Sequence, residues 1–282
     1  MTNETNAEIP TARAGYAIDF LGDRIDPPTL GEGIRDDAVP LEGSPVVPYT
    51  HFSLSVSRSR RLARWVAWNV DGASLKKLSR ANINFARDPR LPDDVQTGNE
   101  LYSGNRLDRG HLARRSDLLW GDLQEAGQAN RDSFFFTNIA PQIDDFNQSG
   151  KAGIWGRLED ALFEGIDVED LRATIMGGPV FHADDRVYRG TALPREYWKL
   201  VVYREGGALR ARAFLLTQNL VEIQALPDLD EFRVYQVTLG ELEQRTDLGF
   251  AEVLHAADLP AAAIVRVAGE RRPLESVAQI RW

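Results

Sequence analysis

The sequence contains no cysteine and very little histidine. None of its 282 residues is Cys, and the four histidines are His51, His111, His182 and His255. Disulfide bonds and thiolate metal sites are therefore excluded. A structural zinc site is not expected either, because it needs several soft ligands and no two histidines are close in the sequence. The absence of cysteine fits a reducing compartment.

Long apolar runs are also missing. No stretch approaches the roughly 18 apolar residues that cross a bilayer, and residues 1–8 contain neither a basic region nor an apolar core of a secretory signal. We therefore expect a cytoplasmic protein with no membrane partner, and export by a non-classical route stays open. The composition, 43% hydrophobic and 27% charged, is typical of a globular protein.

Positive charge is scarce overall but locally concentrated. The formal net charge is −9, which by itself disfavours a nucleic-acid partner. Residues 51–117, however, contain thirteen Lys and Arg against seven Asp and Glu, a balance of +6, so the rest of the chain carries −15. This segregation is compatible with a phosphate-binding face, and a randomly uneven surface is the alternative.

Local patterns predict an arm followed by one domain. Residues 1–45 are rich in Pro, Gly and Asp, and we expect an N-terminal extended arm that wraps a single domain at 46–282. Alternation and β-branched or aromatic content predict strands at 51–57, 64–70, 133–139, 172–180, 198–205, 209–216 and 233–238. Helical spacing predicts helices at 124–131, 154–163, 239–245 and 249–256, with a long loop over 72–102. This order indicates an α+β fold.

The segment Leu107–Ala113 carries the first chemically suggestive motif. Arg109 offers a permanently charged fork that suits phosphate, and His111 can accept a proton near neutral pH. Gly110 permits a close approach of the backbone to a ligand or a strained turn, and Asp108 can pair with an arginine to hold the loop. A lone histidine is more often structural, but these neighbours favour a catalytic one.

Two further segments contain candidate polar side chains. Asn138 and Asn147 are neutral oxygen donors that suit a hard cation such as Mg²⁺, although asparagine is also common in turns. Glu159 follows Trp155 by four residues, so that both lie on one face of the expected helix. Core packing of the tryptophan with a solvated glutamate is the alternative.

Together the motifs resemble those of a known nuclease family. They read Asp108-Arg109-Gly110-His111, Thr137-Asn138-Ile139-Ala140-Pro141-Gln142, Phe146-Asn147-Gln148 and Trp155 to Glu159. In this order and spacing they are similar to the DNA/RNA non-specific endonuclease family of the ββα-metal superfamily, which includes endonuclease G. The resemblance covers roughly residues 46–250 and implies a ββα-metal nuclease fold with a central, largely antiparallel sheet flanked by helices.

The resemblance also implies a role for each matching residue. His111 is expected to act as general base, and Asn147 as the one direct protein ligand of a hydrated Mg²⁺, for which Mn²⁺ can substitute. Arg109 would hold the substrate phosphate or the fold around it. Asn138 would orient the site, and Glu159 would hydrogen-bond the waters of the metal. The implied activity is Mg²⁺-dependent, largely sequence-non-specific cleavage of DNA, RNA or both.

Two arginine clusters are candidates for substrate binding. They comprise Arg58, Arg60, Arg61 and Arg64 between two expected strands, and Arg114 with Arg115 directly after His111. Neither cluster has an acidic residue within it, although ordinary surface arginines are the alternative. Two other functions stay open: a catalytically dead nuclease-fold module that binds nucleic acid, and a phosphodiesterase for small nucleotides. A homodimer and an inhibitor or activating partner are further expectations.

Overall fold

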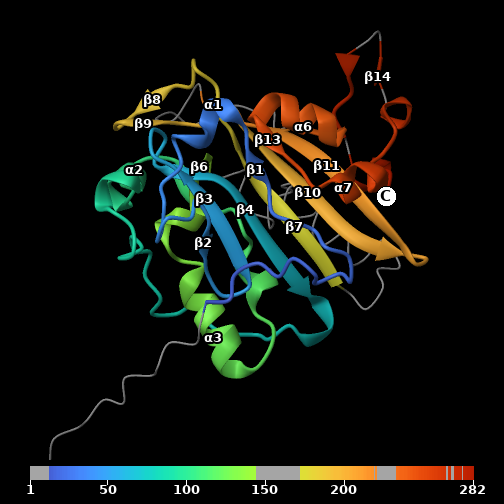
Figure 1. Cartoon of the computed structure of the whole chain (residues 1–282). Helices are drawn as coiled ribbons and strands as arrows, with labels where there is room; N and C mark the ends of the chain where they lie inside the picture. Colours follow the sequence, from blue (N-terminus) through green and yellow to red (C-terminus); the bar gives the residue numbers. More distant parts are fainter. Residues whose placement is uncertain are drawn as a thin grey trace, which may run out of the picture.

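The centre of the molecule is a seven-stranded antiparallel sheet (Figure 1). The computed structural model describes residues 13–143, 172–218, 220, 233–264, 266–267, 270–274 and 276–282. In sheet order the strands are β12 (Arg233–Val237), β11 (Ala208–Thr217), β10 (Glu196–Glu205), β7 (Arg172–Val180), β4 (Leu62–Asp71), β3 (Phe52–Ser57) and β2 (Val47–Pro48). The α+β class and the antiparallel sheet are confirmed.

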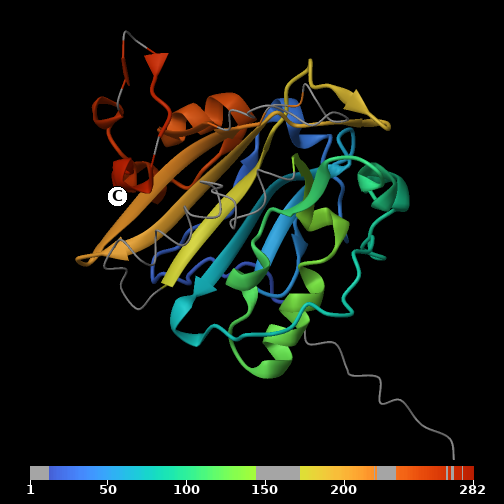
Figure 2. The ribbon, with the colours of Figure 1, turned by 180° about the vertical axis from the view of Figure 1, so that it is seen from behind.

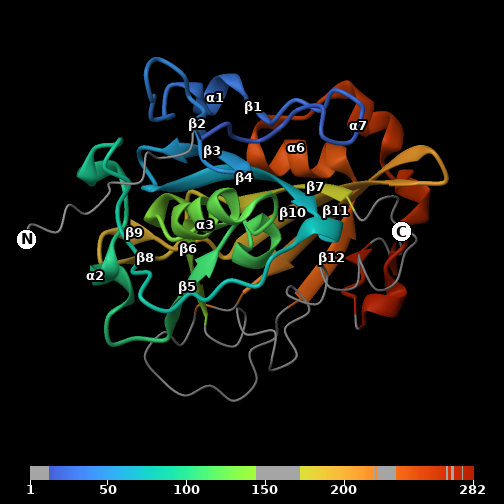
Figure 3. The ribbon, with the colours of Figure 1, turned by 90° about the horizontal axis from the view of Figure 1, so that it is seen from below.

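The sheet is buried on both faces, and alternation assigns each side chain to one of two cores. In β4, Trp65 and Ala67 belong to one apolar cluster, whereas Val66, Trp68 and Val70 belong to the other. Because side chains on a strand point alternately to opposite faces, a strand that is covered on both sides is apolar almost throughout. The sheet therefore separates two layers, which Figure 3 shows from below.

One layer consists of the N-terminal segment and two C-terminal helices, α6 (Leu239–Thr246) and α7 (Glu252–Ala257). Tyr16, Phe20 and Ile25 of the N-terminal segment are buried in the same apolar cluster as these helices. The minor elements of the chain are α1 (Glu32–Arg35), β1 (Thr29–Leu30) paired with β13 (Leu248–Gly249), β8 (Val187–Tyr188) with β9 (Thr191–Ala192), β14 (Arg266–Val267) with β15 (Glu270–Arg271), η7 (Ala261–Ala263) and η8 (Val277–Gln279).

The opposite layer carries the motif segments (Figure 2). It contains the hairpin of β5 (Leu107–His111) and β6 (Ile139–Ile143), the helix α3 (Leu123–Asp132), and the 3₁₀ turns η3 (Arg115–Leu118) and η4 (Phe136–Asn138). Helix α3 begins where the Asp122 carboxylate accepts a hydrogen bond from the Glu125 amide, 2.8 Å away. This layer holds the candidate active site.

One expected strand is wrong. In place of the strand expected at 133–139, helix α3 ends at Asp132, the chain then forms a turn followed by η4, and β6 begins only at Ile139. Asn138 donates its backbone N–H to the Phe135 carbonyl, 2.9 Å away, which closes a turn instead of a ladder. Three consecutive phenylalanines imitate a buried strand in sequence, but here they pack around this turn.

The other expectations have mixed outcomes. The loop over 72–102 is confirmed, with only η1 (Gly72–Ser74), η2 (Asp93–Val95) and the one-turn helix α2 (Asn99–Tyr102) within it. The expected helix at 154–163 lies outside the described residues. In the described part of the chain, no helix combines the length and apolar character that crossing a membrane requires.

Candidate active site

The β5–β6 hairpin brings the first two sequence motifs side by side. His111 is the last residue of β5 and faces Ile139, the first residue of β6. In the same register Asp108 lies opposite Gln142. Segments about thirty residues apart in the chain thus form one antiparallel unit, with His111 at its end.

Gly110 is required by the partner strand. It is buried, and a Cβ atom placed on it would collide with the side chain of Gln142. The glycine therefore gives space to the glutamine of the second motif, and its backbone does not have a positive φ. This differs from the expected roles in ligand approach or in a strained turn.

Asn138 fastens the backbone that follows His111. Its Oδ1 accepts a hydrogen bond from the Ala113 amide at 2.9 Å, and its Nδ2 donates to the carbonyls of Ala113 and Ser133, each at 3.1 Å. Its own carbonyl accepts the Leu112 amide at 2.9 Å. Asn138 is fully buried, so these contacts support an orienting role and not direct contact with substrate.

The imidazole of His111 lies between two phenylalanines. Its ring centroid is 5.3 Å from that of Phe134, edge-on, and 5.8 Å from that of Phe85. Nε2 is buried, and no described residue forms a hydrogen bond with it. An unpaired buried nitrogen costs folding free energy, and such groups are expected where a ligand or water completes the site.

The other three histidines each contact a polar group through a ring nitrogen. His51 contacts the Leu118 carbonyl through Nδ1 at 2.7 Å, and His182 contacts Glu196 through Nε2 at 2.8 Å. His255 contacts Glu243 at 3.1 Å. Each of the three thus has a structural partner on a ring nitrogen, which leaves His111 as the strongest candidate for chemistry.

The surroundings keep His111 neutral. Burial among apolar side chains is the largest cause that lowers its pKa, and together with the nearby guanidinium groups of Arg115 and Arg80 it brings the pKa to about 4. At neutral pH the imidazole therefore carries no proton on one ring nitrogen and can accept one.

Arg80 is a residue of the site that the sequence did not single out. It lies in the loop before Phe85 and is exposed, and its side chain forms no hydrogen bond or ion pair with a described residue. The loop is fixed in place because the Lys76 amide donates to the Leu119 carbonyl at 2.6 Å and Asn130 donates to the Ser79 carbonyl at 3.0 Å. No local pattern could have revealed Arg80, since only this packing brings it close to His111.

Arg115 and Arg114 occupy different positions after His111. The Nε of Arg115 donates to Oδ1 of Asn130 at 2.7 Å, and its Nη2 donates to the Leu78 carbonyl. Arg114 is half-buried and lies 4.0 Å from Asp117. Arg115 thus holds the loop that carries Arg80, and it adds to the positive potential around His111.

Arg109 is sandwiched between aromatic rings. Its Cζ lies 5.4 Å from the centroid of Phe85 and 5.2 Å from that of Tyr102, while Nε and Nη2 donate to Oδ1 of Asn99 at 3.1 and 2.7 Å. Phe85 therefore contacts both Arg109 and His111. Of the two roles expected for Arg109, this geometry supports holding the fold around the site.

Two arginines of the β3–β4 hairpin are neutralised within the fold. Arg64 pairs with Asp37 at 2.6 Å and Arg60 with Asp185 at 3.1 Å, and all four side chains are largely buried. Both guanidinium groups also lie against the ring of Phe181, at 5.2 and 5.0 Å from its centroid. These contacts give Arg60 and Arg64 structural roles in place of the expected phosphate contacts.

The remaining hairpin arginines are less constrained. Arg61 donates through Nη2 to the Gln96 carbonyl at 2.6 Å and lies 3.9 Å from Glu100. Arg58 is exposed. The hairpin is therefore not the continuous group of free cations that the sequence suggested.

The expected metal site lies outside the described residues. Asn147, Glu159 and Trp155 all fall in 144–171. Among the residues that the structure does describe, no three His, Asp or Glu side chains come together in a way that could hold a metal ion. The charged groups that act on the buried Nε2 of His111 are cationic, which fits a site where an anionic substrate supplies the negative charge.

Comparisons with known proteins agree on one family. The model of the DNA/RNA non-specific endonuclease family matches residues 32–257. The chain is 34% identical over 267 residues to uncharacterized protein y4fB of Sinorhizobium fredii, covering 87% of this chain but only 40% of that protein. A nuclease of Nostoc sp. is 30% identical over 203 residues, which cover 71% of this chain and 70% of the nuclease.

More distant similarities extend to eukaryotic enzymes. Mitochondrial endonuclease G of Bos taurus is 26% identical over 188 residues, covering 62% of this chain and 59% of that protein. The crystal structure of an EndoG/EndoGI complex aligns with a TM-score of 0.58 at 19% identity and covers 74% of this chain and 87% of the matched chain. At that identity, the structural likeness establishes the fold alone.

Proposed function

The chain belongs to the DNA/RNA non-specific endonuclease family, and on that premise we propose that it is a metal-dependent endonuclease that hydrolyses phosphodiester bonds of DNA, RNA or both. The observation that carries the proposal is the state of His111. It is neutral, held between two phenylalanines, and has a buried Nε2 with no described partner. A general base must keep this nitrogen available, and the neutral, desolvated imidazole meets that requirement.

His111 takes a proton from the attacking water. A low pKa keeps the imidazole in its neutral form but also makes it a weak base, and proton transfer is most efficient when the pKa lies near the working pH. A phosphodiester anion beside Arg80 and Arg115 offsets their charge, so the pKa of His111 rises towards its ordinary value when substrate binds. The base is thus weak in the free protein and stronger in the complex.

The described arginines can bind the substrate backbone. Arg80 is exposed and close to His111, and the half-buried Arg114 and Arg115 follow it in the chain. Contacts to phosphate oxygens position a nucleic acid without reading its sequence. We therefore expect low sequence specificity, and binding that weakens steeply with salt because each neutralised phosphate releases counterions.

A divalent metal ion completes the proposed site. Asn147 is the proposed ligand of Mg²⁺, Glu159 is proposed to accept hydrogen bonds from the waters of the ion, and Mn²⁺ is expected to substitute. When bound, such an ion neutralises charge that grows on the phosphate oxygens. His111 then supplies proton transfer, while Arg80 and Arg115 supply fixed positive charge beside the phosphate.

A protein inhibitor belongs to the same proposal. The matched crystal structure is that of a complex of EndoG with EndoGI, and it concerns the mechanism of EndoG inhibition. A nuclease with little sequence specificity endangers the nucleic acids of its own cell. An inhibitory partner that covers the basic surface around His111 would control this activity.

The proposal is tested with supercoiled plasmid and with a structureless RNA, each incubated with the protein and Mg²⁺ or Mn²⁺. We expect nicking and then fragmentation without a fixed band pattern, abolished by EDTA and restored by excess metal. Full activity in EDTA contradicts the metal-dependent mechanism. Cleavage of a small nucleotide diester with both polymers left intact indicates a nucleotide phosphodiesterase, and binding without any cleavage indicates a nucleic-acid-binding module.

A further inference from the structure

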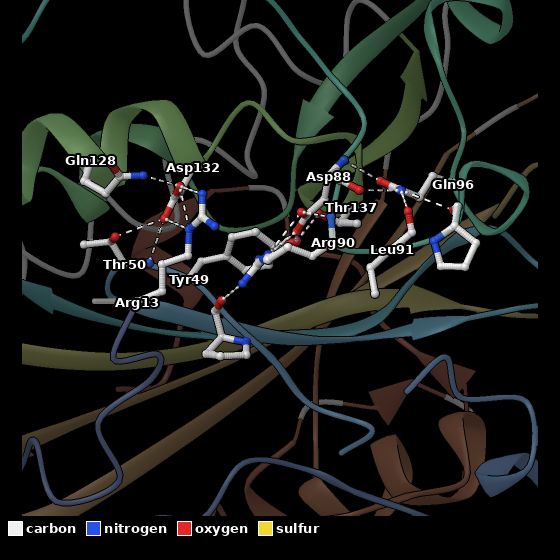
Figure 4. A network of polar contacts seen from close by, with 12 residues as sticks. Arg13, Tyr49, Thr50, Asp88, Arg90, Leu91, Gln96, Gln128, Asp132 and Thr137 are labelled. Atoms are coloured by element: carbon white, nitrogen blue, oxygen red, sulfur yellow. Dashed lines mark hydrogen bonds and ion pairs between the residues drawn. The ribbon is translucent and has the colours of Figure 1, made fainter. Parts of the chain in front are cut away.

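Arg13 comes from a part of the chain that the family model does not cover. The match begins at residue 32, yet residues 13–31 pack against the domain, and Arg13 reaches the buried end of α3. Its Nε and Nη2 donate to Asp132 at 3.1 and 2.9 Å (Figure 4). The guanidinium also lies 5.5 Å from the Phe135 ring centroid and 5.9 Å from that of Tyr49.

Asp132 is a buried carboxylate with an elaborate set of donors. Its side chain is fully buried, whereas that of Arg13 is 25% exposed. Besides Arg13, it accepts hydrogen bonds from the amide and hydroxyl of Thr50, both at 3.0 Å, and from Gln128 at 2.7 Å. The other donors are neutral, so Arg13 is the counter-charge among the residues that hydrogen-bond to this carboxylate in the described structure.

The position of Asp132 in the chain links it to the active site. It is the last residue of α3, and Phe134, two residues later, packs edge-on against His111. Ser133 and Phe134 continue the turn by donating their amides to the carbonyls of Ala129 and Arg131, at 3.0 and 3.1 Å. A displacement of Asp132 therefore moves Phe134 directly.

A second buried carboxylate, that of Asp88, is linked to Thr137, which lies further along the same segment. Asp88 accepts the Tyr49 hydroxyl at 2.5 Å, and that hydroxyl also contacts Thr137 at 2.7 Å (Figure 4). The counter-charge of Asp88 is Arg90, two residues away on the same loop, at 2.6 Å. The Asp88 cluster is therefore local, whereas the Asp132 cluster depends on a residue 119 positions earlier.

We propose that Arg13 is a positioning residue for His111: by neutralising Asp132 it holds the turn after α3 where Phe134 packs against the imidazole. The inference rests on the role of His111 in the proposed function. Without Arg13 the buried carboxylate lacks a counter-charge, and it regains solvation by moving towards water. The end of α3 then shifts, Phe134 follows, and the imidazole loses the ring that holds it and excludes water.

The test compares Arg13→Ala with Arg24→Ala in the full chain. Arg24 lies on the same N-terminal segment, but its pair with Asp26 is exposed, so its replacement should leave all measurements unchanged. Arg13→Ala should lower the Tm by about 5–10 °C. At a temperature where it is fully folded, its kcat should fall about tenfold to a hundredfold, with KM within about twofold. Arg13→Lys should restore part of both.

A second readout separates positioning from stability and does not depend on nuclease activity. The titration of the His111 ring protons is followed by NMR in protein without metal or nucleic acid. Arg115 and Arg80, the cations that act on the imidazole, are the same in every variant. In Arg13→Ala the midpoint of the His111 titration should therefore rise only if Phe134 has moved and water has entered the site. In the double variant Arg13→Ala with Asp132→Asn, this rise should be smaller.

A variant with a lower Tm but wild-type kcat and an unchanged His111 titration would overturn the proposal. Should Arg13→Ala not fold, Arg13→Gln decides in its place, because it keeps a hydrogen-bond donor but removes the counter-charge of Asp132; unchanged kcat and an unchanged His111 titration in that variant count equally against the proposal. If the wild-type protein cleaves nothing, the proposed function fails, and the titration still decides whether Arg13 positions His111.

Discussion

The arginines of the β3–β4 hairpin and those around His111 are held in opposite ways. In the hairpin, Arg64 and Arg60 pair with Asp37 and Asp185. Around His111, Arg115 donates to amide and carbonyl oxygens, and the side chain of Arg80 is exposed and forms no hydrogen bond or ion pair with a described residue.

The difference shows which arginines contribute electrostatic potential beyond the groups that they contact. A guanidinium that is paired with a carboxylate contributes little potential at a distance, whereas one bound to neutral oxygens keeps its charge effective. The first group therefore serves stability. The second group lowers the pKa of His111, and we expect it to contact phosphate.

The largest expected effect is on kcat, for the replacement of His111, which lies beside Arg80 and Arg115. His111→Ala should lower kcat by about 10²–10⁴-fold, because it removes the general base. Stability should not fall much, since the replacement also removes a buried nitrogen without a described partner. Single-turnover cleavage and duplex binding are measured side by side, and near wild-type turnover would refute the role of His111.

For the β3–β4 hairpin we expect a loss of stability with little change in kcat. Arg64→Ala should destabilise the protein by about 2–4 kcal/mol, because it leaves Asp37 without its partly buried counter-charge, while kcat of the folded protein stays within about threefold. Urea denaturation measures the loss. Arg195→Ala, which removes an exposed pair with Asp184, is the matched control and should show no measurable change. A large fall in kcat for Arg64→Ala would contradict the distinction between the hairpin arginines and the arginines around His111.

The pH profile sharpens the comparison. Since the pKa of free His111 is about 4, the acidic limb of kcat/KM should lie well below pH 6.5, and the limb of kcat should lie higher because bound phosphate offsets the arginines. Arg115→Gln should move the kcat/KM limb upwards, and Arg64→Gln should not. A kcat/KM limb at the ordinary histidine value would contradict the assigned environment.

The same pKa shift predicts a change of stability with pH. Between about pH 6.5 and pH 4 the unfolded chain binds a proton at His111 that the folded protein does not. The contribution of His111 to stability should therefore fall as the pH drops through this window and level off below it. Comparison of wild-type and His111→Ala unfolding curves isolates this contribution.

The smallest effect concerns the salt dependence of binding. In a His111→Ala background, Arg80→Ala should flatten the slope of log affinity against log salt by about 0.9, the value for one phosphate contact on duplex DNA. Arg60→Ala should leave the slope unchanged, because Asp185 already neutralises that arginine. Equal slopes for wild type and Arg80→Ala would place Arg80 outside the interface.

Much of the sheet could be predicted because its signal is local. Alternation and apolar content marked the strands β3, β4, β7, β10, β11 and β12 to within a few residues. The exception is 133–139, where Phe134, Phe135 and Phe136 imitate a strand but surround a turn. Their contacts with Phe85, His111 and Tyr102 depend on other segments, and no local period encodes them.

The sequence by itself determined the family and located the segments of the candidate site, because both depend on short motifs: Asp108 to His111 and Thr137 to Gln142 can be identified without knowing their neighbours. Only the tertiary structure decided which charges are compensated. Arg64 pairs with Asp37, Arg60 with Asp185, and Arg13 with Asp132, and the partners are 27, 125 and 119 positions apart in the sequence. Electrostatic interactions depend on distance in space and on burial. The fold therefore determines which arginines pair with carboxylates and stabilise the protein, and which ones, Arg80 and Arg115, lie beside His111.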